Sequence, residues 1–163
     1  AANDAGLNAK SPACYGAVSG TPAALGANAA GRVYMVGYGD SNMPGEVGKA
    51  IVAFKAKFND DYYTLAVHHV YNMLSTAIAQ AKSTDPVKVA KVMEGLKFKS
   101  FNGEVEMRKA DHQLQQGLHI SVWQKADAKF PYSVENTGYN FRSVKYYEPF
   151  VASTPTSCQM KRP

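Results

Sequence analysis

Apolar side chains recur at two different spacings along this chain, and the spacing changes from one segment to the next. Helical spacing, with apolar residues every three or four positions, predicts helices over residues 45–58 and 62–82. The apolar face of the first is formed by Val47, Ala50, Ile51, Phe54 and Phe58. The apolar face of the second is formed by Tyr63, Ala66, Val67, Val70, Tyr71, Leu74, Ala77, Ile78 and Ala81. Each segment is long enough to bury one face against a core.

A third helix is predicted to begin at Asp85-Pro86. Asp85 can accept a backbone hydrogen bond as the N-cap, and Pro86 suits the first helical position because that position needs no N–H donor. The apolar face that follows is formed by Val89, Val92, Met93 and Leu96. Gly95 then ends the helical run.

Segments in which apolar residues occupy every second position predict strands. Leu118, Ile120 and Val122 are the clearest case and predict a half-buried strand. The predicted strands cover residues 32–36, 98–101, 104–108 and 118–123, with shorter candidates around residues 13–15 and 143–147. Strands interspersed with helices predict an α/β fold.

The composition is that of a globular protein, with 163 residues, 45% hydrophobic residues and 19% charged residues. A formal net charge of +5 raises the question of nucleic-acid binding, but the lysines are scattered over the predicted helices rather than clustered. No nucleic-acid partner is therefore expected. The apolar runs are too short for a transmembrane helix, and the first residues lack the pattern of a signal peptide.

The sequence offers few residues for catalysis or metal binding. His68 and His69 are adjacent on a predicted helix, so they point about 100° apart and cannot both ligate one metal. One of them is expected at the boundary of the core, or alternatively in a ligand cleft. Asp111-His112 lacks a G-x-S-x-G nucleophile elbow, and Asp111 is expected to cap a turn. We therefore predict no enzyme activity, no metal and no cofactor.

Glu104 and Glu106 share one face of a predicted strand. Two such carboxylates are compatible with acid–base chemistry. Lysines and an arginine lie close to them in the sequence, so a solvated sheet face is the expected arrangement.

The order of these motifs resembles one protein family. A helix that begins with Asp-Pro, the strand "GEVEMR" at residues 103–108 and the loop "DHQ" at residues 111–113 occur in this order. Upstream, "AGL" at residues 5–7 and "GTPAA" with "GRV" at residues 20–33 extend the match. The chain resembles the substrate-binding proteins of branched-chain amino acid ABC transporters. These are type I periplasmic binding proteins, similar to the Leu/Ile/Val-binding proteins.

The resemblance implies part of a bilobed α/β protein whose lobes have parallel, Rossmann-like sheets with helices on both faces. Residues 1–40 would end the second lobe, and residues 41–100 would form helices that cross back to the first lobe. Residues 101–163 would return to the second lobe and form the C-terminal tail. Family members are more than twice this long, so the chain is expected to be a C-terminal fragment whose partner is the missing N-terminal half. We expect it to pack on that half or to exchange elements with a neighbouring molecule.

The resemblance also implies the function. The expected role is the periplasmic solute-binding component of an ABC importer, which closes two lobes around a small carboxylate-bearing solute and docks on a membrane permease. A ligand-sensing receptor domain with the same fold is the alternative. Because the family is exported, Cys14 and Cys158 suggest a disulfide, but the sequence leaves open whether they pair with each other or with the missing half.

The expected ligand-binding residues lie where the resemblance places the cleft between the lobes. They are Tyr15, Gly16, Ala17, Tyr62, Tyr63 and His68. Tyr15-Gly16 follows a strand end, and Tyr62-Tyr63 is predicted to open a helix whose N–H groups suit a carboxylate. Family members that bind amino acids place an acidic residue near Tyr15 for the ligand's ammonium group. No acidic residue lies between Lys10 and Asp40. The expected solute is an amino acid or an aromatic or aliphatic acid, and an acid without an amino group fits this stretch better.

Overall fold

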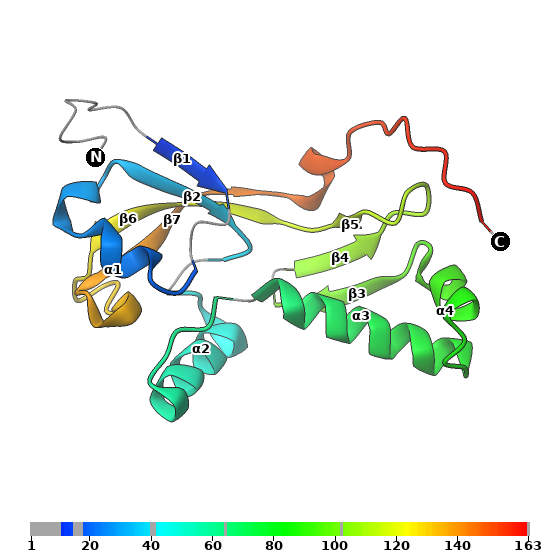
Figure 1. The fold of residues 1–163 in the computed structure, drawn as a ribbon, viewed down its shortest axis with the longest axis horizontal. Coiled ribbons are helices and arrows are strands. Elements are labelled where there is room, and N and C mark those ends of the chain that lie inside the picture. Colours follow the sequence, from blue (N-terminus) through cyan, green and yellow to red (C-terminus); the bar gives the residue numbers. More distant parts are fainter. Residues whose placement is uncertain (1–10, 15–17, 40–41, 64, 102, 163) are drawn as a thin grey trace. The chain divides into compact units, whose positions relative to one another are not determined.

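The computed structural model describes residues 11–14, 18–39, 42–63, 65–101 and 103–162 (Figure 1). The chain divides into two compact units. The first unit contains Ala1–Tyr63 and Leu118–Tyr146, and the second contains Thr64–Gly117 and Tyr147–Pro163. The chain therefore passes from one unit to the other three times, after Tyr63, Gly117 and Tyr146.

The first unit is built on a four-stranded sheet with the order β1-β2-β6-β7. The strands are β1 (Ser11–Cys14), β2 (Val33–Gly37), β6 (Leu118–Lys125) and β7 (Tyr139–Tyr147). β1 is parallel to β2, with Cys14 opposite Val36, whereas β2 and β6 are antiparallel, with Met35 opposite Ser121. The sheet is therefore mixed, and its parallel part is the pair β1–β2.

Helices and turns of the first unit flank this sheet (Figure 1). They are α1 (Thr21–Leu25), η1 (Ala27–Ala29), α2 (Gly45–Phe58) and η2 (Val134–Asn136). α2 has the bounds that its apolar spacing predicts. Val47 and Ile51 are buried as expected, but Phe58 at its C-terminal end is exposed.

Trp123 lies in the hydrophobic core of the first unit and is fully buried. The buried residues of this core are Met35, Trp123, Val134 and Phe141. The indole N–H of Trp123 donates a hydrogen bond to the carbonyl oxygen of Gly26 at 2.9 Å, and the ring of Tyr139 stacks on the indole with centroids 5.5 Å apart. One side chain thus ties the sheet to the turn after α1.

The second unit combines two helices with a small antiparallel sheet. Its elements are α3 (Leu65–Ala81), α4 (Pro86–Met93), β3 (Lys97–Ser100), β4 (Gly103–Met107), β5 (Leu114–Gln115) and η3 (Pro149–Ala152). The sheet has the order β3-β4-β5. Its core contains Met73, Ala77, Val89, Leu96 and Met107.

The predicted start of α4 is confirmed. The Asp85 side chain accepts a hydrogen bond from the backbone N–H of Lys88 at 2.9 Å, and Pro86 occupies the first helical position. Val89 is buried, and Val92 and Met93 are partly buried against the same core. The sequence was sufficient here because a helix cap is decided by residues three or four positions apart.

The prediction for α3 was wrong in two respects. The helix begins at Leu65 rather than at Tyr62. It also buries His69 and Met73, which are not on the predicted core face, whereas Val70 and Tyr71 on that face are exposed. Ala77, on the predicted face, is buried as expected. α3 carries apolar residues over more than one face, so spacing alone cannot tell which face meets the unit's own sheet.

The two units do not coincide with the three predicted segments 1–40, 41–100 and 101–163, because α2 belongs with β1 and β2 in the first unit. The assignment of segments to lobes stays a prediction.

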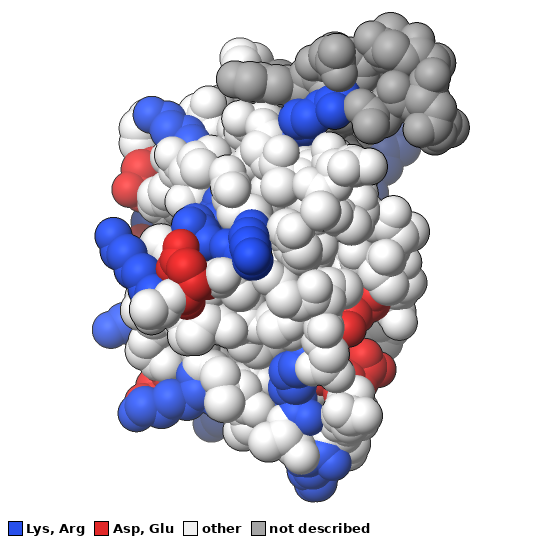
Figure 2. Space-filling model, turned by 90° about the vertical axis from the view of Figure 1, so that its left-hand side faces the viewer, with Lys and Arg blue, Asp and Glu red and all other residues white. Residues whose placement is uncertain are grey.

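Figure 2 shows Lys and Arg side chains spread over one face of the molecule, with Asp and Glu among them, rather than gathered in one basic patch. This distribution gives no support to nucleic-acid binding on that face. No helix in the described part of the chain is long and apolar enough to cross a membrane.

Candidate functional site

β1 and β2 form a parallel pair in the sheet of the first unit. Parallel strands end at the same edge of a sheet, and ligands of open α/β sheets bind beyond the carboxyl ends of the strands. β1 ends at Cys14 and β2 at Gly37. The predicted site residues Tyr15, Gly16 and Ala17 directly follow β1, and they lie outside the described residues.

Tyr62 and Tyr63 lie in the connection between α2 and α3. Asn59 ends α2 in the left-handed conformation, with φ of 52°, and its N–H donates to the carbonyl oxygen of Lys55 at 2.8 Å. Since α3 begins only at Leu65, the two tyrosines precede the helix, and the prediction that they form its first turn was wrong. The connection is instead held by polar contacts to the segment after β6.

Asp61 is the centre of these contacts. The amine of Lys55 lies 3.1 Å and 3.2 Å from its two carboxylate oxygens. The hydroxyl of Tyr132 donates to the same carboxylate at 2.5 Å, and the backbone N–H of Glu135 donates to it at 2.7 Å. The side chains of Lys55 and Asp61 are only 19% and 5% exposed, so this is a buried ion pair with additional donors.

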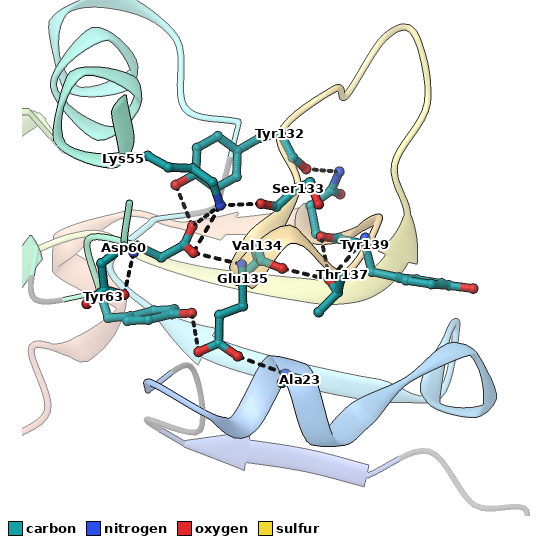
Figure 3. A network of polar contacts seen from close by, with 12 residues as sticks. Ala23, Lys55, Asp60, Tyr63, Tyr132, Ser133, Val134, Glu135, Thr137 and Tyr139 are labelled. Carbon is teal, nitrogen blue, oxygen red and sulfur yellow. Dashed lines mark hydrogen bonds and ion pairs between the residues drawn. The ribbon is translucent and has the colours of Figure 1, made fainter. Parts of the chain in front are cut away.

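Glu135 extends the network to α1, and Figure 3 shows its carboxylate between Tyr63 and Ala23. The hydroxyl of Tyr63 donates to this carboxylate at 2.9 Å. The backbone N–H groups of Gly20 and Ala23 donate to it at 2.6 Å and 2.9 Å. One carboxylate thus joins the start of α1 to Tyr63, two positions before the start of α3.

Both tyrosines of the network are held as hydrogen-bond donors. Burial, and then the hydrogen bond to Glu135, raise the pKa of Tyr63. Burial, and then the hydrogen bond to Asp61, raise the pKa of Tyr132 in the same way. Both phenols therefore keep their proton, and with it the hydrogen bond to the carboxylate, at neutral pH.

Tyr62 differs from Tyr63 in its surroundings. Its ring is half-buried and lies 5.2 Å from the ring of Phe54, which in turn lies 4.7 Å from the ring of Phe58. Phe54 and Phe58 belong to α2, so the end of α2 and the following connection form an aromatic row. Tyr62 therefore offers an aromatic surface on a connection whose backbone the Asp61 network fixes.

The roles of Asp61 and Glu135 were not predicted from the sequence. Most of their donors are distant in the chain: Tyr132 bonds to Asp61 across 71 positions, and Tyr63 bonds to Glu135 across 72. One local feature of the sequence points to a turn here. Asp60 and Asp61 lie between the end of a predicted helix and two tyrosines, and aspartate favours turns.

His68 lies on α3 in the second unit and is exposed. Its ring contacts the side-chain amide of Asn72 at 3.0 Å and packs edge-on against Phe101, with centroids 5.2 Å apart. Its role in ligand binding stays a prediction.

His69 is the buried member of the histidine pair. Its Nδ1 lies 2.6 Å from the hydroxyl oxygen of Ser100 in a hydrogen bond, and its ring stacks on Phe101 with centroids 4.6 Å apart. Burial, and then the positive charge that His68 can carry, lower the pKa of His69 to about 4 from 6.5. The second unit therefore contains a neutral core histidine rather than a metal ligand.

This burial predicts a loss of stability in mild acid. With a pKa of 6.5 unfolded and about 4 folded, the unfolded chain binds more protons between these values. Stability therefore falls as the pH falls through this range, by about 2 kcal/mol between about pH 7 and pH 5. Urea unfolding at both pH values measures it. His69→Gln should remove most of this dependence and His68→Gln should retain it; an unchanged slope in His69→Gln would contradict the assignment.

The other candidate residues of the sequence have structural partners. Arg108 donates to both carboxylate oxygens of Asp111, and Asp111 also accepts the backbone N–H of Gln113 at 3.2 Å, as a turn cap does. Mainly the hydrogen bond from Arg108 lowers the pKa of Asp111 to about 2. The predicted turn-capping role is confirmed.

The predicted solvated sheet face is also confirmed, because the amine of Lys97 lies 3.9 Å from Glu104 and 3.2 Å from Glu106 and all three side chains are largely exposed. Within the described residues, no three His, Cys, Asp or Glu side chains are grouped to hold a metal ion. Cys158 is an exposed free thiol, whereas the side chain of Cys14 lies outside the description.

A family model for periplasmic binding proteins matches residues 1–128. This chain belongs to the periplasmic binding protein family. A search of curated proteins found no significant match. Solved structures show the same fold, so the predicted resemblance to type I periplasmic binding proteins of the Leu/Ile/Val-binding kind is confirmed in family by the family model and in fold by these structures.

Three solved periplasmic binding proteins illustrate the similarity. The leucine-, isoleucine-, valine-, threonine- and alanine-binding protein of Brucella ovis is 23% identical, with a TM-score of 0.83. A solute-binding protein of an ABC transporter from Rhodopseudomonas palustris, solved with p-hydroxybenzoic acid, is 18% identical, with a TM-score of 0.65. The leucine-binding protein LivK of Thermotoga maritima is 17% identical, with a TM-score of 0.64.

The chain spans less than half of each relative. The match to the Brucella ovis protein covers 99% of this chain but 43% of that one. The matches to the other two cover 91% of this chain and 39% and 40% of theirs. The chain of this periplasmic binding protein therefore has the same fold as one part, less than half, of each of these three relatives.

Proposed function

We propose that the protein containing this chain is the solute-binding component of an ABC importer in the periplasm. It captures a small carboxylate-bearing solute between two lobes and presents it to a membrane permease, with no chemical step. Membership of the family supports this proposal, as do the structural relatives, whose descriptions name ABC transporters. A second lobe, supplied by sequence beyond this chain, would complete the site.

The ligand-binding residues proposed from this chain are Tyr15, Gly16, Ala17, Tyr62, Tyr63 and His68. Tyr62 offers a half-buried aromatic surface, and Tyr63 is oriented by its bond to Glu135. A fixed aromatic side chain provides contact area at little cost in conformational entropy. The connection between α2 and α3 is suited to this role because the Asp61 network holds it in place before a ligand arrives.

The proposed solute is an aromatic or aliphatic carboxylic acid without an amino group. The observation that carries this choice is the lack of any Asp or Glu from residue 11 to residue 39, the stretch that includes the end of β1 and the whole of β2. A buried ammonium group needs a paired carboxylate, and this stretch provides none. Relatives solved with p-hydroxybenzoic acid and 3,4-dihydroxybenzoic acid fit the same class of ligand.

Thermal unfolding of the full-length protein with single ligands tests this proposal. We expect p-hydroxybenzoate to raise the melting temperature and leucine to leave it unchanged, since a ligand at about 100 times its Kd stabilises by about 2.7 kcal/mol. Tyr62→Ala should weaken binding at least roughly tenfold, as loss of a stacked aromatic contact does. Phe58→Ala, at the exposed end of the same aromatic row, is the matched control and should bind normally. Stabilisation by leucine alone would contradict the ligand class.

A further inference from the structure

We propose that His119 is a further ligand-binding residue, whose outer ring nitrogen, Nε2, donates a hydrogen bond to the carboxylate of the solute. This contact rests on the proposed function, since it supplies a partner for the acid group of the proposed ligand. His119 lies near the start of β6 and belongs to the first unit, as do β1 and β2. It adds a polar contact to the aromatic residues proposed above.

The pairing of β6 with β2 places His119 at the edge of the sheet where a ligand is expected. β6 lies beside β2 (Figure 1), and the residue opposite His119 is Gly37, the last residue of β2. The carboxyl ends of the parallel strands β1 and β2 meet at this edge, and ligands of open α/β sheets bind beyond it. His119 therefore lies beside the carboxyl end of β2, although it is distant from β2 in the sequence.

The residue opposite His119 leaves room for a ligand. Directly opposite residues of an antiparallel pair point to the same face of the sheet, and Gly37 has no side chain to fill that face. Among the described residues, the atom nearest to a Cβ at position 37 would be the carbonyl oxygen of Gly39, at 4.0 Å. Glycine in a strand often marks a place where a ligand approaches the backbone. Ser121 and Trp123, further along the same face of β6, are buried, whereas His119 is only half-buried.

Two residues of β7 hold the imidazole of His119. Its Nδ1 lies 2.8 Å from the hydroxyl oxygen of Ser143 in a hydrogen bond, and its ring contacts the ring of Tyr146, with centroids 4.9 Å apart. In the neutral form that accepts the Ser143 proton at Nδ1, the hydrogen of the ring is on Nε2, and the imidazolium form also donates there. An oriented N–H donor of this kind suits a carboxylate.

The other three histidines of the chain have different surroundings, and all three belong to the second unit. His69 is fully buried, so it offers no surface to a solute. Nε2 of His112 lies 3.4 Å from the carboxylate of Glu94, which already supplies an anionic partner. His68 is exposed on α3. His119 is thus the one histidine at the carboxyl edge of the parallel pair β1–β2.

Two substitutions that each keep one polar position of the ring test this contact in the full-length protein. His119→Asn keeps a polar atom near the position of Nδ1, within reach of Ser143, but has none near Nε2, whereas His119→Gln places its amide near Nε2. The Kd for p-hydroxybenzoate is measured by isothermal titration calorimetry. We expect it to rise at least roughly tenfold in His119→Asn and less than roughly threefold in His119→Gln, because only the first loses a hydrogen bond to a charged group. His112→Asn is the matched control and should bind normally, since Asn tolerates the left-handed backbone at position 112, where φ is 55°.

Unchanged affinity in His119→Asn would overturn the proposal. A larger loss in His119→Gln than in His119→Asn would overturn it too, because His119 would then act only through Ser143. Should His119→Asn fail to fold, the Nε2 resonance of His119 is followed by NMR while the wild-type protein is titrated, and a resonance that saturating ligand leaves unmoved would refute the contact.

Titration of the wild-type protein separates this contact from the proposed function. If leucine binds and p-hydroxybenzoate does not, the proposed ligand class fails. The same variants are then titrated with leucine, whose carboxylate tests the His119 contact independently. If the wild-type protein binds no carboxylate-bearing solute, the proposed function and the contact are both wrong.

Discussion

Replacing Asp61 with asparagine is expected to lower the free energy of unfolding by about 3–5 kcal/mol, the usual cost of leaving one member of a buried ion pair without its partner. The substitution keeps the shape of the side chain but removes its charge. The amine of Lys55, which is 19% exposed, would lose its carboxylate. The hydroxyl of Tyr132 and the N–H of Glu135 donate to different oxygens of this carboxylate, so asparagine would keep an acceptor for one of them and present an NH2 donor to the other. Urea unfolding followed by the fluorescence of Trp123, the single tryptophan, measures the loss.

Glu46→Gln is the matched control for this acid-to-amide change. Glu46 pairs with Lys49 at 2.8 Å, but both side chains are largely exposed. A surface pair of this kind contributes at most about 0.5 kcal/mol. If Asp61→Asn cost no more than Glu46→Gln, the Asp61 network would not fix the connection before α3, and the proposed preorganisation of Tyr62 and Tyr63 would lose its basis.

The elements that the sequence predicted well are those decided by close neighbours. The start of α4 depends on Asp85 and Pro86 and on the N–H of Lys88, all within four positions. The bounds of α2 depend on a single apolar face and on Asn59, which suits the left-handed end of a helix. In both cases the residues that determine the helix boundary lie within the helix or next to it.

The features that the sequence did not reveal depend on distant partners. The orientation of α3 is decided by what packs against it, and its sequence supports two apolar faces. The connection that precedes α3 is held through Asp61, whose donors Tyr132 and Glu135 are more than 70 positions away. The candidate site also depends on contacts between residues that are far apart in the sequence. Tyr62 and Tyr63 were identified from resemblance, but the network that holds them could be found only in the structure.

Replacing Trp123 with alanine is expected to lower the free energy of unfolding by about 3–5 kcal/mol, because it leaves a large cavity in a close-packed core. Trp123 is 0% exposed and also satisfies the carbonyl oxygen of Gly26. Trp123→Phe should cost less, because it keeps a ring beside Tyr139 and loses mainly the hydrogen bond. Phe150→Ala, at an aromatic residue that is 73% exposed, is the control and should cost under about 0.5 kcal/mol. Since the two Trp123 variants lack the fluorophore, unfolding of all three is followed by far-UV circular dichroism. Equal losses for Trp123→Ala and Phe150→Ala would show that the indole does not hold the β2-β6-β7 sheet to the turn after α1.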